Sequence, residues 1–188
     1  MNTPGRRPPR SRRTFWLLAL LFLAPLVAAF WLYYGSGWRP AGRTNHGELI
    51  EPARPLPAAA GATFTGRWSL VYVGDGACDA DCRATLYMIR QTEASLGRLG
   101  ARVQQVFLVT GHCCDHEYLA HEHPALKIVD AGGAESAPLL APFTPQRRER
   151  GIFIVDPLGN LMMRYDAALD PKGLREDLKR LLDLSHIG

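Results

Sequence analysis

Two cysteines four positions apart, Cys78 and Cys82, have the residue type and spacing to carry chemistry. They stand where a short apolar run, residues 68–74, gives way to a pattern with apolar residues at helical spacing. Both side chains would share one face of the opening helical turn, where unpaired backbone N–H groups stabilise a thiolate. Because the thiolate acts in both disulfide exchange and Cu(I) binding, the pattern indicates a redox pair or a metal clamp. Two buried thiols or a purely structural disulfide are the alternatives.

A second set of soft ligands lies in "GHCCDHEYLAHEHP", residues 111–124, directly after another strand-like run, residues 103–110. If the two runs form adjacent parallel strands, this segment begins at the same sheet edge as Cys78. Thiol and imidazole groups suit Cu(I) or Zn(II). The candidate additional metal ligands are His112, Cys113 and Cys114. Cys113 and Cys114 are alternatively placed to resolve a Cys78 disulfide, or the segment is a solvated loop without a metal.

An uncharged apolar stretch, residues 15–35, precedes all four cysteines. Its length matches the roughly 20 residues that cross a bilayer as a helix, and aromatic residues mark both of its ends. Arginines in the preceding tail, residues 1–14, favour a cytoplasmic N-terminus and a domain in the periplasm of a bacterial inner membrane. Two alternatives are signal-peptide cleavage near residues 27–29 and a twin-arginine export signal in "SRRTFWL". Both leave the domain on the same side of the membrane.

The formal net charge of +4 is concentrated in the N-terminal tail, which holds five of the 22 basic residues. The rest of the chain has 17 basic and 18 acidic residues, so its charge gives no support for nucleic-acid binding. A location outside the cytoplasm is oxidising and lets disulfides persist. The compartment therefore agrees with a redox function for the cysteines.

The chain is expected to contain one domain, residues 61–188, tethered by a flexible linker rich in Gly, Pro and Ala, residues 36–60. The domain opens with a strand, a helix and a strand at residues 68–74, 82–99 and 103–110. This order is typical of a βαβ unit with parallel, neighbouring strands.

The second half of the domain is expected to hold a short helix, a short strand, a hairpin and a closing helix. They fall near residues 117–121, 126–129, 151–166 and 171–182. The hairpin turn is "DPLGN", where Pro157 presets a turn conformation and Gly159 or Asn160 can take a positive φ. The whole order predicts an α/β, thioredoxin-like mixed sheet flanked by helices.

The motif "YVGDGACDADCR", with the later "FIVDPLGNLMMRY", resembles the Sco (SenC) family of thioredoxin-fold, membrane-anchored copper chaperones for cytochrome c oxidase. The resemblance implies that Cys78 and Cys82 are the two sulfur ligands of copper and can also cycle through a disulfide. Two positions depart from the family. Arg83 replaces a usual proline, and Arg148 stands where the family has its third copper ligand, a histidine. A guanidinium group cannot ligate copper.

The leading hypothesis is a membrane-anchored, Sco-like copper chaperone or thiol-redox protein that acts through Cys78 and Cys82 in assembling a respiratory cytochrome c oxidase. Its expected cargo is copper, and its expected partner is an oxidase subunit or another periplasmic copper or thiol protein. A thiol-disulfide oxidoreductase with no stable metal site is the alternative enzyme. The third hypothesis is an interaction module whose cysteines are vestigial.

Overall fold

The structure, a computed structural model, describes residues 12–35, 44–58, 61–144, 148, 151–166 and 170–188. The chain divides into two compact units at residue 43. The first contains α1 (Arg12–Tyr34), which is long and apolar enough to cross a membrane; an N-terminal signal sequence meets the same criterion. The apolar helix predicted over residues 15–35 is therefore confirmed. Most of the basic tail lies outside the described residues.

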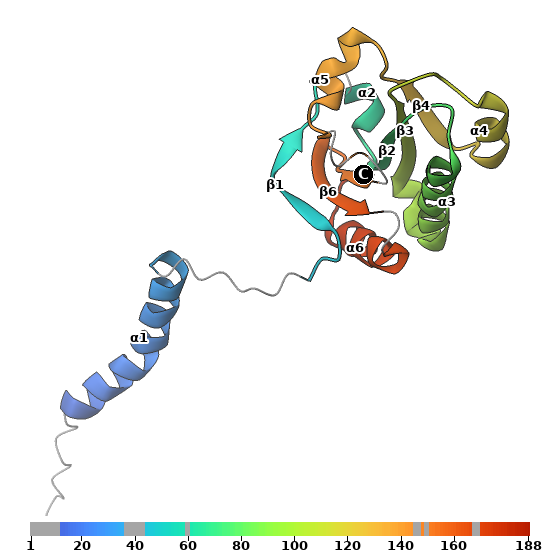
Figure 1. The fold of residues 1–188 in the computed structure, drawn as a ribbon. Helices are drawn as coiled ribbons and strands as arrows, with labels where there is room; N and C mark the ends of the chain where they lie inside the picture. The colour runs from blue at the N-terminus through green and yellow to red at the C-terminus, as the bar shows by residue number, and fades with distance from the viewer. Residues whose placement is uncertain (1–11, 36–43, 59–60, 145–147, 149–150, 167–169) are drawn as a thin grey trace, which may run out of the picture. The chain divides into compact units, whose positions relative to one another are not determined.

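The second unit is built on a six-stranded mixed sheet in the order β1-β6-β5-β2-β3-β4 (Figure 1). Strands β2, β3 and β4 run parallel, whereas β5, β6 and β1 form antiparallel pairs. The bounds are β1 (Glu48–Pro55), β2 (Trp68–Gly74), β3 (Val103–Val109), β4 (Leu126–Asp130), β5 (Gly151–Val155) and β6 (Asn160–Asp166). The predicted thioredoxin-like mixed sheet is thus confirmed.

Helices cover both faces of this sheet (Figure 1). One face carries α3 (Ala80–Ser95), the 3₁₀ segment η2 (Gly97–Arg102) and α6 (Pro171–Leu184). The other carries α2 (Gly61–Phe64), η3 (Ala134–Ser136) and α5 (Ala137–Leu140), while α4 (His116–Glu122) connects β3 to β4. Alternate residues of β2 enter opposite cores, Leu70 and Tyr72 on the α3 side and Val71 and Val73 on the other. This explains why β2 has an unbroken apolar run, residues 70–73, rather than an alternating pattern.

The predicted βαβ unit and hairpin are both present. Strands β2 and β3 are adjacent and parallel, with Tyr72 opposite Phe107. At the hairpin turn the Asp156 carboxylate accepts from the backbone N–H groups of Leu158 and Asn160, at 2.9 and 2.8 Å. Gly159 takes a φ of +86°, which a residue with a Cβ rarely adopts.

The linker predicted over residues 36–60 is wrong in part, because residues 48–55 form the edge strand β1, paired with β6. The start of this segment is held by Asp177 of α6, which accepts from the N–H groups of His46 and Gly47 at 2.7 and 3.1 Å. The Tyr165 hydroxyl also donates to Asp177, at 2.5 Å. The unit begins at Thr44. The prolines and exposed side chains of β1 give no regular pattern from which this strand could be predicted, since an edge strand tolerates both.

Candidate functional site

Cys78 and Cys82 form a disulfide at the junction between β2 and α3. Cys78 precedes the helix, with a left-handed φ of +48°, and its N–H donates to the Asp75 carbonyl at 3.3 Å. Asp79 caps α3 by accepting from the N–H of Cys82 at 2.9 Å. A carboxylate rather than a cysteine sulfur therefore occupies the helix N-terminus, and the expected stabilisation of a Cys78 thiolate there is reduced. Both cysteines are only 2% exposed.

The second cysteine pair lies at the same edge of the sheet. Cys113 and Cys114 are joined by a disulfide in the loop between β3 and α4. The two loops touch through their backbones, because the N–H of Asp115 donates to the carbonyl of Gly76 at 3.0 Å. A Cβ on Gly76 would lie 2.3 Å from the His112 carbonyl oxygen and 2.9 Å from the Cys113 Cα. The two loops can therefore approach each other this closely only because residue 76 has no Cβ.

Arg83 ties the two loops together through its side chain. Its Nε donates to the Cys78 carbonyl at 3.1 Å, and its Nη2 donates to Asp115 Oδ2 at 3.1 Å. The guanidinium also lies over the Tyr118 ring, 4.3 Å from the centroid. The sequence singled out Arg83 only as a departure from the Sco pattern, and nothing in its local context signalled that it would span two loops.

Tyr72 packs into the same core cluster as the Cys78–Cys82 disulfide. Burial, with the charges of Asp79 and Asp81, raises the pKa of Tyr72 to about 12, so the phenol stays neutral. The ring stacks on Phe107 with centroids 5.3 Å apart. The same burial and carboxylates oppose any further negative charge in this region. Sequence reasoning missed Tyr72, because nothing distinguishes it from the other apolar residues of β2.

Arg148 lies just before β5, whose antiparallel pairing with β2 brings this end of β5 to the sheet edge of the cysteine loops. Its guanidinium binds the α5 segment, with Nε donating to the Phe143 carbonyl at 2.6 Å and Nη2 to the Leu140 carbonyl at 2.8 Å. Burial lowers the pKa of Arg148. The residue at the expected third-ligand position therefore has a structural role on the opposite face of the sheet.

A family model described as transmembrane-like, thioredoxin-like, C-terminal domain matches residues 68–185, which contain both cysteine pairs. The chain belongs to this family. No curated protein sequence matches the chain significantly.

Solved structures of Sco proteins share the fold of this transmembrane-like, thioredoxin-like protein. The apo Sco1 protein of Thermus thermophilus is 20% identical with a TM-score of 0.54, over 76% of this chain and 99% of that chain. Copper-bound yeast Sco1 is 16% identical with a TM-score of 0.53, over 66% and 84% of the two chains. Copper-bound Arabidopsis thaliana ScoI is 16% identical with a TM-score of 0.55, over 66% and 89%. The predicted resemblance to the Sco family is thus confirmed at the level of the fold.

The ligand chemistry of this family member differs between its two cysteine loops. Within the part of the chain that the structure describes, the sole group of three soft donors close enough to share an ion is Cys113, Cys114 and His116, whose ligand atoms lie within 4.8 Å of one another. Cys78 and Cys82 supply two sulfurs without such a third donor among those residues. The exposed His112 is outside the group, although the sequence favoured it over His116.

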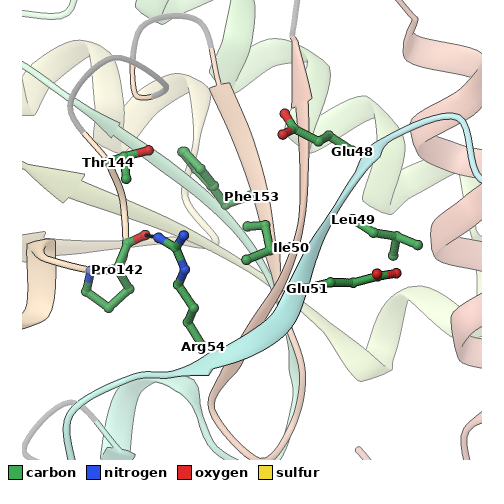
Figure 2. Close-up of a pocket in the computed structure, with 8 residues that line it drawn as sticks. All are labelled: Glu48, Leu49, Ile50, Glu51, Arg54, Pro142, Thr144 and Phe153. Atoms are coloured by element: carbon green, nitrogen blue, oxygen red, sulfur yellow. Dashed lines mark hydrogen bonds between the residues drawn. The ribbon is translucent and has the colours of Figure 1, made fainter.

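A pocket of about 280 Å³ lies elsewhere on the domain, between β1, β5 and the segment after α5 (Figure 2). Its lining residues are Glu48, Leu49, Ile50, Glu51, Arg54, Pro142, Thr144 and Phe153. Arg54 closes one side by donating to the Pro142 carbonyl at 3.2 Å (Figure 2). This contact joins the edge strand to the segment whose Phe143 carbonyl accepts from Arg148.

Proposed function

We propose that this protein is a membrane-anchored, Sco-like redox protein whose Cys78–Cys82 pair cycles between disulfide and dithiol while handling copper or the thiols of a copper protein. The observation that carries the proposal is the Cys78–Cys82 disulfide at the carboxyl end of central strand β2, in a Sco-type fold. Ligand and active sites of such α/β folds gather at this edge of the sheet.

The redox step is ordinary thiol-disulfide exchange. A thiolate of a partner attacks one sulfur of the Cys78–Cys82 bond, and that bond breaks as a mixed disulfide forms. A second thiol of the partner then attacks the mixed disulfide. The partner leaves oxidised, and Cys78 and Cys82 each gain a proton. Because both cysteines are buried, the loop at residues 75–79 must open for the first attack.

Copper is the proposed cargo of the reduced form. A dithiol offers two soft sulfur ligands to Cu(I), and binding displaces the thiol protons, so the redox state controls binding. The copper-bound structures of two Sco proteins with this fold support copper as the metal. The proposed acceptor is a cytochrome c oxidase subunit or another copper or thiol protein of the periplasm. We place α1 in a bacterial inner membrane with the basic tail in the cytoplasm.

A thiol-disulfide oxidoreductase that keeps no metal is the second candidate function. The observation that favours it is the binding of the Arg148 guanidinium to the carbonyls of Leu140 and Phe143. A Cu(I) ion held by Cys78 and Cys82 would therefore lack the third ligand expected at this position. In that case the same exchange chemistry operates on protein thiols without copper.

The deciding experiment uses the full chain in detergent, carrying Cys113→Ser and Cys114→Ser so that only the Cys78–Cys82 bond titrates. We expect a reduction potential above about −300 mV, compatible with exchange outside the cytoplasm. A potential well below this value would assign the bond a structural role and overturn the redox proposal. The same reduced variant is then offered Cu(I) under competition from a chelator without air. Retention of copper supports the chaperone function, and failure to retain it favours the oxidoreductase.

The orientation is tested by fusing a reporter that is active only outside the cytoplasm to the C-terminus of the chain. The expected result is an active reporter in the membrane fraction. An inactive reporter would overturn the periplasmic placement.

A further inference from the structure

The loop after β3 holds three soft donors, two of which are open to solvent. Cys113 and His116 are exposed and Cys114 is half-buried, whereas Cys78 and Cys82 are almost completely covered. With Cys113 and Cys114 joined as a disulfide, the ligand atoms of the three residues lie within 4.8 Å of one another. An incoming metal ion would therefore reach this loop without the opening that the Cys78–Cys82 pair requires.

The surrounding contacts hold this loop in place. Asp115 caps α4 by accepting from the N–H of Tyr118 at 3.3 Å, and it also accepts the hydrogen bond from Arg83 at 3.1 Å. The N–H of His116 donates to the Cys114 carbonyl at 2.8 Å, and Cys114 packs against the apolar core. The backbone carrying the donors is therefore supported on both sides, as a preorganised site requires.

We infer that Cys113, Cys114 and His116 form a Cu(I) site separate from the Cys78–Cys82 pair. Thiolate sulfur and imidazole nitrogen are soft or intermediate ligands that suit Cu(I). Three protein donors would leave a Zn(II) ion with a fourth position to be filled by water or another ligand. Once its disulfide is reduced, the loop would offer two sulfurs and one nitrogen, whereas the Cys78–Cys82 pair lacks a third donor among the described residues.

This site opens only on reduction. An external dithiol breaks the Cys113–Cys114 bond, leaves as a disulfide and delivers two thiols to the loop. Cu(I) then displaces both thiol protons and takes neutral His116 as its nitrogen donor. The choice of copper rests on the proposed function, but the site itself does not require Cys78 or Cys82. It gives copper an exposed entry point beside the buried pair.

The test measures Cu(I) retained by the full chain in detergent, reduced and without air, against a chromogenic Cu(I) chelator. The double variant Cys78→Ser with Cys82→Ser is expected to retain one Cu(I), which is lost when Cys113 and Cys114 are also replaced by Ser. In the Cys78→Ser, Cys82→Ser background, His116→Ala is expected to weaken affinity by at least about tenfold. The matched control is the exposed His186→Ala, which should leave affinity unchanged.

Each contrary result has a separate meaning. No copper on the Cys78→Ser, Cys82→Ser variant, or equal affinities for His116→Ala and His186→Ala, would overturn this site. A loss with His112→Ala in place of His116→Ala would overturn the ligand assignment. Stronger retention of Zn(II) than of Cu(I) would overturn the assignment of copper as the metal of this site. If the site fails while the Cys113→Ser, Cys114→Ser protein still cycles or binds copper, the proposed function stands. X-ray absorption should detect two sulfurs and one nitrogen around the copper. His116→Gln is a second variant, which removes the imidazole but keeps a polar side chain at the first residue of α4.

Discussion

The guanidinium of Arg83 donates to the carboxylate of Asp115 at 3.1 Å, across two loops that each carry a disulfide. The same side chain donates to the carbonyl of Cys78. Arg83 therefore connects the strained backbone before α3 with the cap of α4. This contact couples the positions of the two cysteine pairs, and its removal should affect both.

Arg83→Gln is expected to lower the free energy of unfolding by about 1 kcal/mol, since the pair is half-exposed and its Coulomb energy is screened. The reduction of Cys78–Cys82 by a small dithiol should become faster, because the Cys78 carbonyl loses its partner. Denaturant unfolding and thiol labelling provide the two measurements. Asp115→Asn is the control that keeps the cap of α4 but weakens the ion pair. Unchanged reduction rates in both variants would contradict the coupling.

Gly76→Ala is expected to destabilise the protein by about 1–3 kcal/mol, because its Cβ would lie 2.3 Å from the His112 carbonyl oxygen. Relief of this clash requires the two cysteine loops to separate. Gly132→Ala is the matched control, since its Cβ would meet nothing closer than 3.4 Å, and its effect should stay within about 0.5 kcal/mol. Equal unfolding midpoints for the two variants would show that the loops are not in close contact.

Arg148→Ala is expected to cost about 1–3 kcal/mol of stability, because the carbonyls of Leu140 and Phe143 lose their charged donor. Arg148→Lys should recover part of this loss, since an ammonium group still donates but lacks the planar fork. Thermal unfolding of the two variants provides the comparison. An Arg148→Ala protein as stable as the wild type would assign the residue a role other than support of the α5 segment.

Brief treatment with limiting dithiol, followed by alkylation, should label Cys113 well before Cys78 or Cys82. The reason is exposure, because Cys113 is open to solvent and both members of the other pair are 2% exposed. Their labelling requires local opening of the protein. Mass spectrometry of the labelled peptides follows the order of reaction, and labelling after denaturation serves as the control. Simultaneous labelling in the native protein would contradict the burial of the Cys78–Cys82 pair.

His123 should make the protein less stable as the pH falls below about 6.5. Burial, with the nearby charge of Arg90, lowers the pKa of His123 in the folded state, and its Nδ1 has no hydrogen-bond partner within the described structure. The unfolded chain therefore takes up a proton at His123 at a higher pH than the folded protein does. Stability due to this residue begins to fall near the ordinary value of 6.5 and falls further until the lowered pKa is reached.

The comparison is between unfolding midpoints at pH 7 and pH 5. His123→Phe keeps a ring beside Tyr118, whose centroid lies 5.7 Å from that of His123, and should reduce the pH dependence. His186→Phe, at an exposed position, should keep the wild-type dependence. An identical pH dependence of the unfolding midpoint in all three proteins would show that His123 does not contribute to it.

Much of the fold could be predicted from local patterns. The apolar β2, the helical spacing in α3 and the turn at Gly159 each specify an element through contacts close in the chain, and all three are present. The edge strand β1 could not be predicted, because its stability comes from pairing with β6 and from the distant carboxylate of Asp177. Exposed prolines and charges in β1 give no periodic signal.

The sequence by itself determined which side chains can do redox or metal chemistry, and the parallel order of β2 and β3 that brings their loops to one edge. Only the tertiary structure decided how those side chains are used. It buried Cys78 and Cys82, turned Arg148 toward carbonyls of the opposite face, and grouped His116 rather than His112 with Cys113 and Cys114. The physical reason is that burial and ligand geometry depend on residues far apart in the chain, such as Arg83 and Asp115, whose contact exists only after folding.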